Sequence, residues 1–173
     1  IGNGNSFKKM LEIGSGSCLL LNTLKKMSLI DSCIAVDLPF VIPFGFTLSS
    51  YVQGESNSLC LPNENDKNSW LIFQSNNRIK IKNNSVDLVI NITSFGEMNK
   101  KQVNHYFSLI NEALCPGGFF LCINREKKKV DFSDYPWPTQ GYRTILEFEP
   151  MISRVGRNKM WRYPVIGKVI QKI

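Results

Sequence analysis

Short apolar runs of strand length alternate along the chain with segments in which apolar residues recur with the period of a helix. This alternation is typical of an α/β domain in which helical crossovers connect parallel strands. The predicted strands are 7–13, 33–36, 70–73, 86–92 and 119–123, and the predicted helices are 17–27, 40–52 and 99–114. We therefore expect a three-layer α/β fold with a mostly parallel sheet.

The segment 86–92 is the predicted centre of this sheet. It is mostly β-branched and lacks polar alternation, as expected for a parallel strand that is covered on both faces. The helix after it places its apolar residues on one narrow arc, which should pack on the sheet: Val103, Tyr106, Phe107, Ile110 and Leu114. The segment 54–69 is a predicted loop. Near the chain end, 142–149 and 160–173 are expected to pair in antiparallel fashion, connected through 154–159.

The composition fits one globular domain over residues 1–173, with 43% hydrophobic and 20% charged residues. Because the chain starts at Ile1, close to its most informative motif, we expect that upstream sequence is missing. The five cysteines form no C-x-x-C pair and lie mostly in apolar surroundings, which favours reduced core thiols in a cytoplasmic protein and no metal site. No charge-free apolar run reaches the roughly 18 residues of a membrane span, so no membrane partner is expected.

The net charge of +7 would suit a polyanionic partner, but the basic residues are spread along the chain. Their densest run, 125–129, is expected to be a solvated loop. The basic stretch 154–172 could instead contact a phosphorylated substrate.

The first strand leads through Glu12-Ile13-Gly14-Ser15-Gly16 into a helix. Small residues at such a turn let the backbone approach a ligand, which indicates a cofactor loop. A dinucleotide fingerprint would have a further glycine where this chain has Leu19, which argues against NAD or FAD.

Two carboxylates accompany this loop. Asp37 ends the next predicted strand about 20 residues after the glycines, where a carboxylate accepts hydrogen bonds from ribose hydroxyls. Its alternative role is a helix N-cap ahead of Pro39. Glu12 lies near the end of a buried strand and requires a partner, either on a ligand or from Lys8, Lys9 or a backbone amide.

Over about residues 11–137 these motifs resemble the sugar O-methyltransferase family within the class I S-adenosylmethionine-dependent methyltransferases. The resemblance rests on the glycine loop, Val36-Asp37-Leu38-Pro39, the run 90–98 (Ile-Asn-Ile-Thr-Ser-Phe-Gly-Glu-Met), Pro116-Gly117-Gly118, Asn124-Arg125 and Tyr135-Pro136-Trp137. The Ser-Phe-x-Glu-Met stretch and the Asn-Arg pair indicate this family in particular. Cys18 departs from the pattern, because many methyltransferases have a third glycine there.

The resemblance implies S-adenosylmethionine as cofactor and a seven-stranded sheet with one antiparallel strand near the C-terminus. The residues implied to bind the cofactor are Glu12, Gly14, Ser15, Gly16, Asp37, Leu38, Asn91 and Ser94, with Glu12 toward its cationic amino-acid end. The segment 91–94 would border the methyl-transfer site.

A sugar hydroxyl requires a base within hydrogen-bond reach. Glu97 is the predicted catalytic residue because it follows the fourth strand at the edge where α/β sheets bind ligands, although the dipole of the next helix would also favour a carboxylate there. His105 is expected to face solvent, opposite the apolar arc. Arg125 could bind an acceptor hydroxyl or acidic sugar, or be a solvated charge. Tyr135 and Trp137 could stack on a sugar face or pack in the core.

The expected function is methyl transfer from S-adenosylmethionine to a hydroxyl of a sugar or sugar-containing acceptor, a small molecule or glycan. The alternatives are a methyltransferase for nucleic acid or another small molecule, and a non-catalytic binding domain. Nucleic acid is not the expected partner, because 91–94 reads Asn-Ile-Thr-Ser and lacks the Pro-Pro-aromatic signature of adenine methyltransferases. Cys115-Pro116 precedes the fifth strand, whereas cytosine enzymes have Pro-Cys after the fourth.

Overall fold

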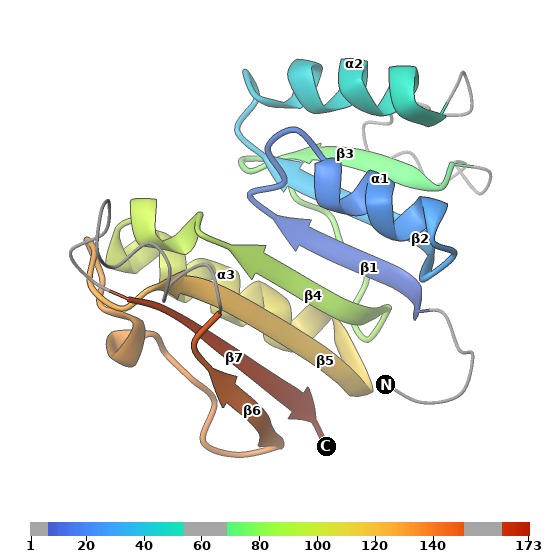
Figure 1. The fold of residues 1–173 in the computed structure, drawn as a ribbon. Helices are drawn as coiled ribbons and strands as arrows, with labels where there is room; N and C mark the ends of the chain where they lie inside the picture. The colour runs from blue at the N-terminus through green and yellow to red at the C-terminus, as the bar shows by residue number, and fades with distance from the viewer. Residues whose placement is uncertain (1–6, 54–68, 151–163) are drawn as a thin grey trace.

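The computed structural model describes residues 7–53, 69–150 and 164–173, which form a seven-stranded sheet with helices on both faces (Figure 1). The strands are β1 (Phe7–Ile13), β2 (Ile30–Asp37), β3 (Leu71–Ser75), β4 (Val86–Ile92), β5 (Leu114–Arg125), β6 (Tyr142–Phe148) and β7 (Val165–Lys172). Within these ranges the helices are α1 (Leu19–Lys26), α2 (Ile42–Gln53) and α3 (Lys100–Ala113), with short 3₁₀ turns η1 (Phe95–Glu97) and η2 (Phe132–Asp134).

The strand order is β3-β2-β1-β4-β5-β7-β6. Strands β1 to β5 are parallel to one another, and β7 is antiparallel to both β5 and β6. The chain builds outward from β1 to β3 and then returns to the other side of β1 with β4. Open α/β sheets bind ligands at such a reversal of strand order. The predicted fold class, the antiparallel strand near the chain end and the adjacency of the first and fourth predicted strands are confirmed.

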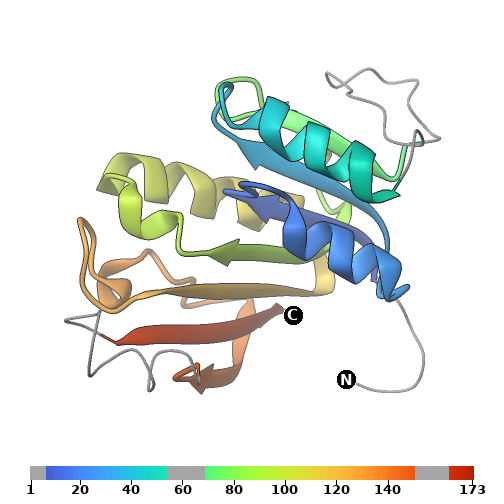
Figure 2. The same cartoon turned by 45° about the horizontal axis from the view of Figure 1, so that its top comes forward.

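Helices α1 and α2 cover one face of the sheet and α3 covers the other (Figure 1, Figure 2). Because successive residues of a strand point to opposite faces, β1 contributes to both layers. Met10 packs with Leu21 of α1, whereas Leu11 packs with Ile110 of α3. The apolar arc predicted for the helix after β4 is the face that is buried.

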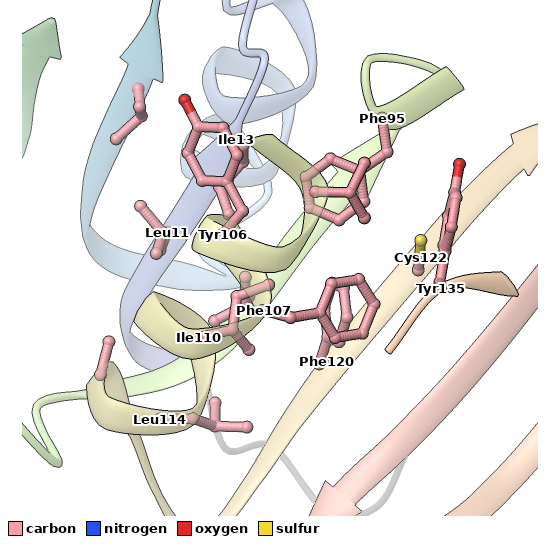
Figure 3. Packing of buried hydrophobic residues seen from close by; sticks show 14 of the residues in the cluster. Leu11, Ile13, Phe95, Tyr106, Phe107, Ile110, Leu114, Phe120, Cys122 and Tyr135 are labelled. Atoms are coloured by element: carbon pink, nitrogen blue, oxygen red, sulfur yellow. The ribbon is translucent and has the colours of Figure 1, made fainter. Parts of the chain in front are cut away.

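Aromatic side chains fill the core between α3 and the sheet (Figure 3). The ring of Phe95, which is fully buried, lies 5.8 Å from that of Tyr106 and 5.7 Å from that of Phe107. Phe107 in turn lies edge-on to Phe120 at 5.6 Å. Tilted and edge-on pairs are the favourable arrangements for aromatic rings. Through Phe95 this core fixes the turn η1, and therefore the direction in which the chain leaves β4.

The start of α3 is fixed by a capping box. The Asn99 side chain accepts a hydrogen bond from the Gln102 amide, and the Gln102 side chain accepts one from the Asn99 amide, both at 2.9 Å. These two bonds satisfy backbone donors that a helix start leaves unpaired. Since α3 begins directly after η1, the capping box also holds the edge of the sheet at which β4 ends.

Several predicted boundaries were too narrow. Strand β2 starts at Ile30, β3 continues to Ser75, and β5 starts at Leu114 although the Cys-Pro-Gly-Gly run suggested a later start. Leu114 pairs with Val86 across an irregularity in register, a tertiary contact that joins this turn to the sheet. Most of the predicted loop 54–69 and all of the predicted connection 154–159 lie outside the described residues.

The four cysteines within the described ranges are free thiols, and Cys18, Cys33 and Cys122 are buried, as predicted. The same part of the chain contains no group of His, Cys, Asp or Glu side chains that could bind a metal ion. None of its helices is long and apolar enough to cross a membrane.

Candidate functional site

The carboxyl ends of β1, β2 and β4 meet at one edge of the sheet, because Ile13 pairs with Val36 on one side and with Asn91 on the other. A pocket of about 220 Å³ lies at this edge. Its lining residues are Gly14, Val36, Asp37, Leu38, Asn76, Ser94, Glu97, Met98, Gln102 and Tyr106. Half of them belong to the set predicted from the sequence to bind cofactor or acceptor, so the fold brings these predicted residues together.

The chain leaves β1 through a tight loop in which Gly14 and Gly16 have positive φ angles of 75° and 53°. Residues with a Cβ rarely adopt such backbone angles. Gly14 also lies so close to Ser94 that a Cβ would collide with it. Cys18, where many methyltransferases have a glycine, adopts φ 58°, so the departure in sequence leaves the left-handed backbone in place at a modest conformational cost.

Asp37 ties the end of β2 to this loop. Its carboxylate accepts a hydrogen bond of 2.7 Å from the Gly16 amide and another of 2.7 Å from the Leu38 amide. A carboxylate has about four acceptor positions, so two remain for a ligand that enters the pocket. Helix α2 begins only at Ile42, which is too far along the chain for Asp37 to be its N-cap. The ribose interpretation therefore fits the geometry better.

Glu12 is buried beside the glycine loop with only 5% of its surface exposed. Its Oε2 has no hydrogen-bond partner among the described residues. The partners considered from the sequence, Lys8, Lys9 and a backbone amide, therefore do not reach this atom. Burial, and secondarily the charge of Asp37, raises the pKa of Glu12 to about 8. A buried carboxylate oxygen without a partner is costly, and the group fits a site for the cationic part of a ligand.

A buried amide network connects the ends of β1, β4 and β5. The Asn91 side chain donates to the Ile13 carbonyl at 2.9 Å and to Ser94 Oγ, and Ser94 Oγ donates to the same carbonyl at 3.1 Å. Asn124 donates to Asn91 Oδ1 at 2.7 Å and accepts from the Gly96 amide at 3.1 Å. Asn91 is completely buried, so its side chain positions the loop around the pocket and does not face a ligand.

Glu97 ends η1 at the rim of the pocket. Lys128 Nζ lies 2.7 Å from Glu97 Oε1, and Lys129 Nζ donates to the Glu97 carbonyl at 2.8 Å. The side chain of Glu97 is 64% exposed. The hydrogen bond from Lys128 is the main cause that lowers the pKa of Glu97. The charges of Lys129 and Arg125 lower it further, so Glu97 is ionised but weakly basic in this arrangement.

Three predicted acceptor residues lie away from the pocket lining. Arg125 ends β5 at the same edge of the sheet, within electrostatic range of Glu97. Tyr135 is 3% exposed and packs edge-on to Phe95 at 5.9 Å, so core packing accounts for it. Trp137 packs edge-on to the ring of Phe107 at 5.2 Å. It also borders a separate pocket of about 360 Å³, which is lined in part by Glu126, Lys127 and Asp131.

His105 is exposed, as its helical phase predicted. Five residues that line the pocket were not predicted as site residues: Val36, Asn76, Met98, Gln102 and Tyr106, whose ring belongs to the predicted core arc. Asn124, which completes the amide network, was also missed. The signal for Asn124 was present, because a polar residue at the end of an apolar strand requires buried hydrogen-bond partners. Tyr106 carried no such signal, since an apolar arc does not reveal where the edge of the core lies.

Comparisons with known proteins concern the fold. No protein-family model matches the chain, and no curated protein matches it. A TehB-like S-adenosylmethionine-dependent methyltransferase from Corynebacterium glutamicum is similar with a TM-score of 0.68, at 15% identity over 98% of this chain and 83% of that one.

An S-adenosylmethionine-dependent methyltransferase from Aquifex aeolicus has a TM-score of 0.58 at 15% identity, over 96% of this chain and 82% of that one. Phosphoethanolamine N-methyltransferase 1 of Haemonchus contortus, bound to phosphoethanolamine and S-adenosylhomocysteine, has a TM-score of 0.65 at 11% identity, over 99% of this chain and 40% of that one. The strand order and these similarities show that the chain has the Rossmann-like fold of the class I S-adenosylmethionine-dependent methyltransferases.

Proposed function

We propose that this chain binds S-adenosylmethionine at the glycine loop and transfers its methyl group to a hydroxyl of a sugar or sugar-containing acceptor. The observation that carries the first part is the meeting of the Gly14 loop, Asp37 and Glu12 where the strand order reverses. The unpartnered Oε2 of Glu12 fits a cationic amino group, and the two remaining acceptor positions of Asp37 fit two ribose hydroxyls.

The other residues would complete the cofactor site. The backbone of Gly14, Ser15 and Gly16 allows close approach, and Gly14 packs so closely on Ser94 that a Cβ there would collide with it. Leu38, which is 40% exposed beside Asp37, offers an apolar contact for a base. Asn91 and Ser94 act on the loop through the Ile13 carbonyl, so they position the site from beneath.

When bound, the cofactor supplies the methyl group on a sulfonium, ready for in-line displacement. The acceptor oxygen forms a bond to the methyl carbon as the carbon–sulfur bond breaks, and the hydroxyl proton must leave. Glu97 is the proposed acceptor of this proton, because it lines the same pocket as Gly14 and Ser94. Its low pKa makes orientation of the hydroxyl a large part of its contribution. Alignment of the reactants by the pocket supplies the rest of the rate enhancement.

The sugar acceptor is supported by the resemblance of the 94–98 run and the Asn124-Arg125 pair, and by the position of Arg125 within electrostatic range of Glu97. Trp137 lies in the neighbouring pocket, where it could contact an extended acceptor. Tyr135 would act through packing alone.

A methyl-transfer assay with a panel of sugars and sugar nucleotides tests this proposal. We expect Glu97→Gln to retain the fold and the affinity for S-adenosylhomocysteine while it lowers the transfer rate by about two orders of magnitude. His105→Ala is the matched control on the neighbouring helix and should leave rate and stability almost unchanged. Near-normal turnover of Glu97→Gln with any accepted sugar would exclude Glu97 as the base. Transfer to nucleic acid alone would overturn the sugar assignment.

A further inference from the structure

The turn that follows β5 is docked against the rim of the pocket. It follows Arg125, the last residue of β5, and contains a run of three lysines, and it lies at the same end of the sheet as η1 (Figure 1, Figure 2). Two of the lysines converge on a single residue of η1: Lys128 on the Glu97 carboxylate and Lys129 on the Glu97 carbonyl. The three lysines of the turn are exposed, as expected for a solvated loop, and these contacts also make the turn part of the pocket rim.

Gly96 leaves room for this docking. A Cβ at Gly96 would lie 3.3 Å from Lys128 Cγ and 3.6 Å from Lys128 Cβ, so the aliphatic stem of the lysine crosses the turn where no side chain intervenes. The side chain of Lys128 is 29% exposed, which indicates that its stem is partly packed while its ammonium reaches the rim. Because the stem is already held in place, the Lys128 ammonium loses less side-chain entropy when a ligand binds it.

Two ammonium groups, those of Lys128 and Lys129, contact Glu97, whose carboxylate carries a single negative charge. The charge of Arg125 also acts on Glu97. The carboxylate of Asp37 lines the same pocket, at the end of β2, which lies on the other side of β1 from β4. A ligand that spans the pocket therefore meets negative charge at the Asp37 end and positive charge at the Glu97 end. The uneven charge favours an acceptor with an anionic group on the Glu97 side.

We propose that the methyl acceptor carries a phosphate or carboxylate group that binds Lys128 and Lys129 at the Glu97 rim of the pocket. This inference rests on the proposed methyltransferase function and specifies its substrate class. Each ammonium has three donors, of which one on each lysine is engaged by Glu97. The arriving anion competes with the Glu97 carboxylate for Lys128. Release from Lys128 and a new anionic neighbour both raise the pKa of Glu97, so acceptor binding would make the carboxylate a better base.

The test is a calorimetric titration of the protein saturated with S-adenosylhomocysteine, at low ionic strength in Tris-chloride buffer. Three matched probes are used: glucose 6-phosphate, glucuronate and glucose. We expect at least one anionic probe to bind at least about tenfold more tightly than glucose, with an affinity that falls as salt is added. The anion that binds more tightly identifies the group as phosphate or carboxylate.

The Lys128→Ala/Lys129→Ala double variant should weaken binding of the anionic probe by at least about tenfold and leave the affinity for S-adenosylhomocysteine unchanged. The control is Lys8→Ala/Lys26→Ala, which removes the same charge from exposed positions at the opposite edge of the sheet. Glu97→Gln should strengthen anion binding, because the competing carboxylate is lost. Suppose that S-adenosylhomocysteine binds but the anionic probes bind no better than glucose. The anionic acceptor is then refuted and the proposed function stands. Equal binding of the anionic probes to both double variants refutes the anionic acceptor in the same way. If S-adenosylhomocysteine does not bind, both proposals fail.

Discussion

Replacement of Glu12 by glutamine should have opposite effects on stability and on cofactor binding. The carboxyl is almost fully buried, one of its oxygens has no partner, and its pKa is about 8 in the folded chain against an ordinary value of 4.5. At a pH below the ordinary pKa of 4.5, both the folded and the unfolded chain hold the proton, so the group has no effect on stability. As the pH rises above it, the unfolded chain loses the proton first, and the free energy of unfolding falls until the folded carboxyl also ionises.

The magnitude follows from the two pKa values. At about pH 7.5 the carboxyl destabilises the ligand-free fold by about 4 kcal/mol relative to acid conditions, and at about pH 5 by about 1 kcal/mol. Glu12→Gln removes this dependence. The difference in unfolding free energy between the two proteins should therefore change by about 3 kcal/mol over this range, in favour of the variant at higher pH. Urea unfolding at several pH values measures the difference directly, and Glu112→Gln, at an exposed position on α3, is the control.

Cofactor affinity should respond in the other direction. Binding of a cationic amino group requires the ionised carboxylate, so the wild-type affinity for S-adenosylhomocysteine should rise with pH up to about 8, with release of a proton. Glu12→Gln should bind at least about tenfold more weakly and lose this pH dependence. A pH-independent difference in stability would refute the raised pKa. Unchanged affinity in the variant would place the amino group elsewhere.

Two further predictions concern the support of the pocket. Gly14→Ala should abolish detectable binding of S-adenosylhomocysteine in calorimetry, because a Cβ at φ 75° collides with Ser94; retained wild-type affinity would mean that the loop is not the binding surface. Asn124→Ala should lower the free energy of unfolding by about 2–4 kcal/mol in urea titrations, because it leaves Asn91 Oδ1 and the Gly96 amide buried without partners; a loss below about 1 kcal/mol would contradict the network.

Much of the fold followed from local patterns in the sequence. The apolar runs located β1 and β4, and the glycine loop together with Asp37 indicated which ends of the strands meet. These features are predictable because strand length, burial on both faces and a turn with positive φ all restrict the residue types locally. The start of β5 was missed because its pairing with Val86 depends on a distant part of the chain.

The missing parts of the site depend on contacts between distant segments. Lys128 meets Glu97 across 31 positions, and Asn124 meets Asn91 across 33 positions, so neither pair leaves a periodic signal. For Tyr135 the sequence left open whether the ring stacks on a sugar or packs in the core, and the structure buries it in the core. Residue type indicates which chemistry is available, whereas the packing decides whether a side chain faces a ligand.

The central claim is that the Gly14 loop and Asp37 bind S-adenosylmethionine, and calorimetric titration of S-adenosylhomocysteine into wild type and Asp37→Ala tests it most directly. We expect one ligand per chain for wild type. We also expect an affinity at least about tenfold lower for Asp37→Ala, which loses two hydrogen bonds of a charged acceptor to the ribose. Because Asp37 also accepts from the Gly16 amide, the melting temperature of each ligand-free protein is measured alongside. Absence of binding to wild type, or equal affinity for the two folded proteins, would contradict the claim.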